Sequence, residues 1–149
     1  MKLLNLLSFS AILMTSVGFS QSNTPLYLDA NQADEVRLDD LMSRMTLEEK
    51  VYQMNQFVGL DHMREAEKNL SVEDLHSNDA QGFYKGLFSD DVAQMTKEGK
   101  IGSFLHVLTT EEANLLQELA FQSRLKIPIL IGIDAIHGNA LVSGTTVYP

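Results

Sequence analysis

Residues 129–133 limit the possible folds of this chain more than any other segment. They read Ile-Leu-Ile-Gly-Ile, without the alternation of apolar and polar residues that a strand with one wet face shows. Such runs are typical of parallel strands that are buried on both faces. Parallel strands need crossover connections, which are usually helices. The segment therefore predicts a buried strand in an α/β fold.

The preceding residues supply a strand and a crossover helix. Residues 101–108 form an apolar run of strand length, and Thr109 with Glu112 then forms a capping box, which explains this glutamate as a helix-start residue. The helix that follows is predicted to reach about Arg124. Its inward-facing residues are predicted to be Ala113, Leu116, Leu119 and Ala120.

Two helices are predicted nearer the start of the chain. Apolar residues recur at helical spacing from Asp34 to Met45. Thr46 and Glu49 form another capping box, and the helix that it opens is predicted to continue until Gly59. A short helix should lead into a second one, with a turn near Thr46.

The region between these helices and the first predicted strand is less regular. Residues 60–86 have no sustained hydrophobic period and are predicted to be a surface insertion with one helical turn. A short helix is predicted from Ser89 to Lys97, with Gly99 as its stop.

These elements do not complete a fold. Two strands and one crossover helix leave a parallel sheet uncovered, whereas such a sheet needs helices on both faces or closure into a barrel. The sequence is therefore expected to be the opening portion, about two strands, of a larger α/β domain that is incomplete here.

Residues 1–20 have the order of a secretory signal. Lys2 precedes an apolar stretch, and the small residues Gly18 and Ser20 stand before a plausible cleavage site at Gln21. We expect export to the periplasm or the extracellular space, with a retained N-terminal anchor as the alternative. Residues 21–33 are polar and are predicted to be an extended lead-in.

Composition removes several classes of function. The 149 residues carry a formal net charge of −9, which argues against binding to nucleic acid or to an anionic membrane surface. The chain has no cysteine, so disulfides, thiol nucleophiles and thiolate metal sites are excluded.

Polar residues follow the apolar run at the end of the predicted strand. In parallel βα architectures the loops after the strands build the site, and this rule selects Asp134, with His137 shortly after it. The Asp134 carboxylate can accept hydrogen bonds from neighbouring hydroxyls, which suits a polyol or sugar. The equal alternative is that Asp134 caps its own turn. His137 either contacts a ligand or orients its neighbours.

A metal site has little support in the sequence. Asp134 and His137 have a suitable spacing, but His62, His76 and His106 are scattered. His106 ends the first predicted strand at the same sheet edge, where it either reaches the pocket or packs as a strand-end histidine. We expect no metal. The sequence also has neither a P-loop nor a serine nucleophile elbow.

Three segments carry a resemblance to a known family. Residues 36–51 (VRLDDLMSRMTLEEKV) resemble the opening signature of glycoside hydrolase family 3, and residues 99–103 resemble its first barrel strand. The strongest similarity lies in residues 127–138 (IPILIGIDAIHG) and continues through 147–149.

The resemblance implies that residues 34–149 are the N-terminal part of a (β/α)8 TIM-type barrel domain. It implies a retaining exo-β-glycosidase, most often a β-glucosidase, that acts on β-linked oligosaccharides or glucosides without a cofactor. Asp134 would hold hydroxyls of the terminal sugar. The catalytic nucleophile and the acid/base would lie beyond residue 149, so we expect the isolated chain to be inactive and poorly folded.

The alternative from another class is a short exported protein that binds sugar or a partner chain without catalysis. It would need a compact core from these residues alone. The buried strand predicted at residues 129–133, with nothing to cover it, argues against this alternative.

Overall fold

The computed structural model describes residues 24–69, 71, 73–74, 84 and 86–147. The predicted signal segment, residues 1–20, therefore lies outside the described residues, and so does His76. Of the lead-in predicted at residues 21–33, the part from Thr24 onward is described.

The centre of the fold is a three-stranded parallel sheet with the order β1-β2-β3. The strands are β1 (Gln56–Val58), β2 (Ser103–Leu105) and β3 (Leu130–Gly132). In their register, Phe57 lies beside Phe104, which in turn lies beside Ile131. The predicted α/β class is therefore confirmed, with one strand more than the two that were predicted. The sheet is compatible with part of a barrel, and the barrel itself stays a prediction.

The additional strand, β1, corrects the prediction of a helix up to Gly59. The helix α2 (Leu47–Tyr52) has the predicted capping box at its start, but it ends before β1 begins. The Asn55 carbonyl then accepts hydrogen bonds from the N–H groups of Gly102 and Ser103, at 3.1 and 3.2 Å. Pairing with a strand nearly fifty positions away in the chain therefore overrides the local helical spacing.

The helix α3 (Leu60–Asn69) corrects the predicted surface insertion over much of its first half. Its residues Leu60 and Met63 are fully buried. The sequence did not predict this helix because most of its residues are polar and only a narrow apolar stripe faces the core. Most of the rest of the predicted insertion, residues 70, 72, 75–83 and 85, lies outside the described part of the chain.

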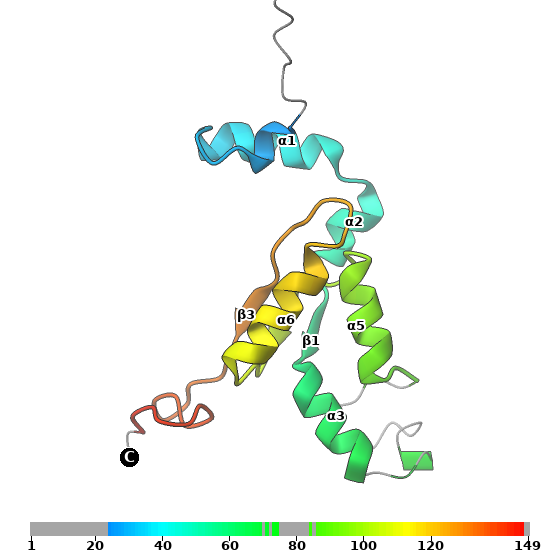
Figure 1. Ribbon diagram of the computed structural model, residues 1–149, viewed down its shortest axis with the longest axis vertical. Coiled ribbons are helices and arrows are strands. Elements are labelled where there is room, and N and C mark those ends of the chain that lie inside the picture. The colour runs from blue at the N-terminus through cyan, green and yellow to red at the C-terminus, as the bar shows by residue number, and fades with distance from the viewer. Residues whose placement is uncertain (1–23, 70, 72, 75–83, 85, 148–149) are drawn as a thin grey trace, which may run out of the picture.

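The other helices lie close to where the sequence predicts them. They are α1 (Asp34–Arg44), α5 (Ser89–Lys97) and α6 (Thr110–Ala120). The predicted stop at Gly99 follows the C-terminus of α5. This residue has a φ of 73°, a left-handed conformation that favours glycine. α6 ends at Ala120 rather than near Arg124, and the chain then crosses back to β3 (Figure 1).

The core lies between the sheet and the helices α3, α5 and α6, with α5 beside both of the others. Phe104 in β2 is fully buried there. The core side chains are Phe57, Leu60, Met63, Val92, Ile101, Phe104, Val107, Leu116, Leu119, Ala120 and Ile129. The predicted inward face of α6 is therefore confirmed at Leu116, Leu119 and Ala120, and Ala113 packs against the same cluster.

The predicted burial of residues 129–133 on both faces is wrong for this structure. Ile129 is buried, but Leu130 is 74% exposed and Ile131 is 41% exposed. β3 is the edge strand of the sheet that the described residues form. Because strand side chains stand on the two faces of a sheet, these residues stay exposed where the described part of the chain supplies no layer over the edge strand.

The lead-in also differs from its prediction, because Leu26–Leu28 forms a single 3-10 turn between extended residues. The turn packs against α1. There the backbone N–H of Tyr27 donates to the carboxylate of Asp40, at 3.1 Å. Among the described residues, no helix is both long and apolar enough to cross a membrane.

Candidate functional site at the carboxyl ends of the strands

The carboxyl ends of the parallel strands meet at one edge of the sheet, at the end remote from α1 and α2 (Figure 1). β1 leads through Gly59 into α3, β2 ends before His106, and β3 ends before Asp134. Ligand sites of open parallel sheets lie at this edge. The structure therefore brings two candidate residues from the sequence, His106 and Asp134, to one place.

His106 and Asp134 face each other across the ends of two neighbouring strands. His106 Nε2 lies 3.5 Å from Asp134 Oδ2, and the two side chains are 27% and 59% exposed. This separation is longer than an ordinary hydrogen bond. The Asp134 carboxylate is thus an exposed acceptor with one charged or polar neighbour in the described part of the chain.

The backbone holds His106 in an uncommon conformation. Its N–H donates to the Gly132 carbonyl at 2.9 Å, which continues the ladder between β2 and β3. Its φ is 60°, in the left-handed region that few residues other than glycine adopt, although histidine does so more often than most. Its Nδ1 is buried and has no hydrogen-bond partner in the described structure.

His137 lies in the exposed loop after β3. It makes no hydrogen bond or ion pair among the described residues. The loop is shaped by Gly138, whose φ is 68° and which bridges to Val147. The Thr145 hydroxyl closes it by donating to the carbonyl of Asn139. The structure thus places His137 in the loop next to Asp134 but not against its carboxylate.

Only half of the capping box predicted for Thr109 and Glu112 forms, because the Glu112 side chain has a different partner. The Thr109 side chain accepts a hydrogen bond from the Glu112 N–H as predicted, at 3.1 Å. The Glu112 carboxylate, however, accepts from the N–H of Asp61 at the start of α3, at 3.0 Å. The Glu112 residue is 3% exposed. It therefore joins the first turns of α6 and α3 just behind the site.

The surroundings of Glu112 disfavour its charged form. Burial raises the pKa of its carboxyl group, and the nearby Asp61 carboxylate acts in the same direction. The N–H of Asp61 and the Arg64 guanidinium favour the charged form and offset part of this effect. A Cβ atom at Gly59 would lie 2.7 Å from Glu112 Oε1, so glycine at this position gives the carboxylate its space.

Metal-ligating side chains do not cluster in the part of the chain that the structure describes. Across the described ranges, no group of three or more histidine, aspartate or glutamate side chains is placed to hold an ion. Asp134 and His137 thus have no third ligand there. His62 is an exposed residue in the first turn of α3.

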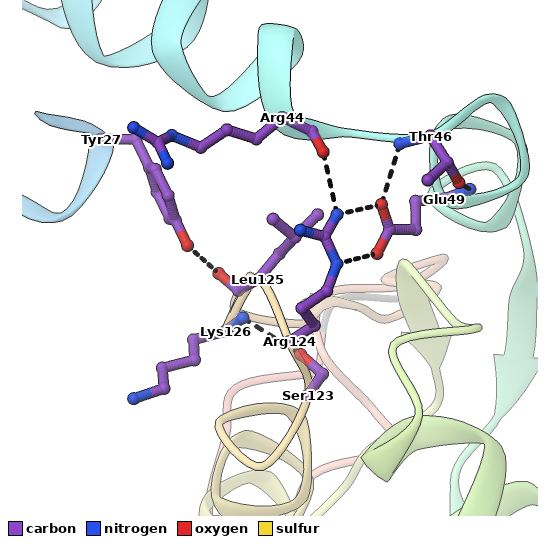
Figure 2. A network of polar contacts seen from close by, with 8 residues as sticks. All are labelled: Tyr27, Arg44, Thr46, Glu49, Ser123, Arg124, Leu125 and Lys126. Atoms are coloured by element: carbon purple, nitrogen blue, oxygen red, sulfur yellow. Dashed lines mark hydrogen bonds and ion pairs between the residues drawn. The ribbon is translucent and has the colours of Figure 1, made fainter. Parts of the chain in front are cut away.

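A second polar cluster lies at the opposite end of the sheet, where α2 meets the loop before β3. Figure 2 shows how the Arg124 guanidinium is held there. Its Nε–H donates to the Glu49 carboxylate at 2.9 Å, and its Nη2–H donates to the Arg44 carbonyl, also at 2.9 Å. Glu49 also accepts from the Thr46 N–H at 2.9 Å. The Arg124 hydrogen bond lowers the pKa of the Glu49 carboxyl group.

This second cluster, which we call the amino-end network, also ties down the first residues of the chain that are described. The Tyr27 hydroxyl donates to the Leu125 carbonyl at 3.1 Å, and the Lys126 N–H donates to Ser123 Oγ at 3.1 Å (Figure 2). Its polar groups bond to one another, so the network joins α1, α2 and the loop before β3. We assign it a structural role.

The fold and the strand-end residues define an α/β protein with its candidate site at the carboxyl edge of a parallel sheet. No protein-family model matches the chain. Curated proteins do match it. The chain is 32% identical to "Probable beta-glucosidase C" of Aspergillus oryzae over 131 residues, which cover 87% of this chain and 19% of that protein.

The chain is also 30% identical to "Beta-glucosidase C" of Emericella nidulans over 122 residues, which cover 81% of this chain and 18% of that protein. It is 27% identical to "Periplasmic beta-glucosidase" of Salmonella typhimurium over 122 residues, covering 80% and 12% respectively. The chain is thus related to β-glucosidases of glycoside hydrolase family 3, as the sequence predicted. It spans 12–19% of the length of these relatives.

Proposed function

We propose that this chain is part of an exported, retaining exo-β-glycosidase that hydrolyses terminal, non-reducing β-D-glucosyl residues by double displacement. The observation that carries the proposal is the exposed carboxylate of Asp134 at the carboxyl end of β3, in a chain similar to proteins named β-glucosidase. Residues 34–149 would form the N-terminal part of a (β/α)8 barrel domain, of which the present strands are three.

Asp134 is proposed to bind the sugar rather than to break its bond. An ionised carboxylate accepts hydrogen bonds from neighbouring hydroxyls and makes them stronger than bonds to a neutral acceptor. The exposure of Asp134 leaves room for such a ligand. His137, in the adjoining loop, is proposed as a second contact to the sugar.

The residues that react are proposed to lie beyond residue 149. Retaining hydrolysis uses two carboxyl groups about 5 Å apart, one as the nucleophile and one as the acid/base. The resemblance assigns these roles to an aspartate on a later barrel strand and to a glutamate further along. The role proposed for this chain is thus to shape the pocket for the terminal glucosyl unit.

Export is proposed on two grounds. Residues 1–20 have the order of a secretory signal, and one relative is named a periplasmic β-glucosidase. The protein would therefore act in the periplasm or the extracellular space on β-linked oligosaccharides or glucosides.

The first test is to sequence the source DNA through and beyond the codon for Pro149, and to assay the encoded protein on p-nitrophenyl β-D-glucoside. A frame that continues for several hundred residues, with turnover of the glucoside, is the expected result. A stop codon directly after Pro149 would contradict the proposal and would leave a short exported sugar- or protein-binding remnant as the better account.

A further inference from the structure

We propose that His106 is a positioning residue for Asp134: its imidazole fixes the orientation of the carboxylate that receives the sugar. This inference rests on the function proposed above. It deepens that function by adding a second residue, from a different strand, to the sugar-binding edge. The resemblance assigned no role to His106, and the sequence left it open between a site residue and a packed strand-end histidine.

The geometry gives His106 a partner in the site. Its Nε2 lies 3.5 Å from Asp134 Oδ2, so a small closure of either side chain makes a hydrogen bond from the Nε2 proton to that oxygen. Contacts of this kind are often long before a substrate binds and shorten in the complex. With Oδ2 held by His106, Oδ1 is the oxygen that faces a sugar hydroxyl.

The other imidazole nitrogen indicates which of the two carries the proton. His106 Nδ1 is buried without a partner in the described structure, and a neutral imidazole carries its proton on one nitrogen only. A buried donor without a partner is more costly than a buried acceptor. The proton therefore belongs on Nε2, which is the nitrogen that faces Asp134.

The backbone adds a third argument. The φ of 60° at His106 is a strained conformation for a residue with a side chain. The N–H of the same residue is bonded to the Gly132 carbonyl, two positions before Asp134. The conformation thus fixes the imidazole relative to the end of β3, which is the relation that a positioning residue needs.

The test combines two substitutions in the full-length protein. His106→Ala is expected to lower kcat/KM for p-nitrophenyl β-D-glucoside about tenfold, because a loosely held contact group binds the transition state less well. In an Asp134→Ala background, the same substitution should cause almost no further loss. The inference would be overturned if His106→Ala lowered kcat/KM by the same factor with and without Asp134. It would also be overturned if His106→Ala alone left kcat/KM unchanged.

Two matched variants separate the imidazole from other effects. His106→Asn keeps a residue that tolerates the left-handed backbone but has a shorter side chain, so it should retain the melting temperature and lose the activity that His106→Ala loses. Wild-type activity in His106→Asn would overturn the inference. His62→Ala removes an exposed histidine of α3 and should leave both KM and kcat unchanged.

A readout without substrate distinguishes this inference from the proposed function. In ¹⁵N spectra of the imidazoles, the His106 signals, identified by their loss in His106→Ala, should shift on Asp134→Asn. If the protein hydrolyses the glucoside but these signals do not move, only the pairing is wrong. If the signals move but the protein has no glycosidase activity, the proposed function fails, and so does the positioning role assigned to His106.

Discussion

At the amino end of the sheet Glu49 is 21% exposed and hydrogen-bonded on both oxygens, whereas at the carboxyl end Asp134 is 59% exposed and has one neighbour at 3.5 Å. Both are carboxylates beside a basic side chain. In the amino-end network the protein itself occupies the acceptor positions, so the carboxylate holds chain segments together. At the carboxyl edge the Asp134 oxygens are exposed, and we propose that they accept hydrogen bonds from a sugar.

This difference separates stability from function within one small sheet. Substitutions at the amino end should change the free energy of unfolding and leave the proposed reaction alone. Substitutions at the carboxyl edge should change the proposed reaction with little effect on stability.

The largest effect on stability is expected from Gly102→Ala, at the start of β2. A Cβ atom there would lie 2.1 Å from the Gln53 backbone carbonyl oxygen, so the backbone itself must move. We expect a loss of about 3 kcal/mol in the free energy of unfolding. Urea denaturation of the full-length protein checks this value.

Gly132→Ala is the matched control, since its added Cβ would meet Leu105 at an ordinary 3.5 Å. It should change the unfolding midpoint far less. Equal effects of the two substitutions would show that the packing of β2 against the α2–β1 turn is looser than described.

The largest effect on activity is expected from Asp134→Ala. Loss of charge-assisted hydrogen bonds to the sugar should lower kcat/KM of the full-length protein about a hundredfold. Because the side chain is exposed, the melting temperature should hardly change. Unchanged steady-state kinetics on the best glucoside would remove Asp134 from the site.

A smaller effect is expected from Glu49→Gln in the amino-end network. The amide keeps the size of the side chain but loses the ion pair with Arg124, which is partly exposed to solvent. We expect a destabilisation of about 1 kcal/mol or less and unchanged kcat/KM. An activity loss that exceeds the stability loss would break the division between the two ends.

The smallest and most specific effect concerns pH. The pKa of Glu49 is lowered from 4.5 by its hydrogen bond to Arg124, so its stabilising contribution is present above about pH 4.5 and is lost as the pH falls through the lower folded-state pKa. The pKa of buried Glu112 is raised from 4.5. Its contribution is therefore greatest below about pH 4.5 and declines as the pH rises through the raised pKa.

Urea midpoints of the wild type, Glu49→Gln and Glu112→Gln across about pH 3 to 8 measure both signs. The stability difference between the wild type and Glu49→Gln should grow in favour of the wild type as the pH rises. The difference between the wild type and Glu112→Gln should shift in the opposite direction. Parallel slopes for the two variants would contradict the different surroundings described for these carboxylates.

Local signals made much of the fold predictable. The capping box of Thr46 and Glu49, the stop at Gly99 and the inward face of α6 each depend on residues within a few positions. Such signals decide helices because capping and periodicity act over one or two turns.

The remaining features depend on distant partners. β1 has three residues and exists through its pairing with β2, which no local pattern reveals. The Glu112 carboxylate likewise finds its partner in Asp61, fifty-one positions away. The exposure of Leu130 follows from the position of β3 at the edge of the described sheet.

The candidate site divides in the same way. The end of the apolar run at residue 133 was enough to predict Asp134 as a strand-end carboxylate. The register between β2 and β3 was needed to place His106 beside it. Sequence reasoning left both alternatives for His106 open because that register is a property of the sheet.

The most direct test of the account is to follow glucose release from a β-glucoside by ¹H NMR, using the full-length protein. A retaining glycosidase forms a covalent intermediate and releases the sugar with its original configuration. We expect β-glucose to appear first and to convert to the α-anomer only later. Release of α-glucose first, or no hydrolysis of any β-glucoside, would contradict it.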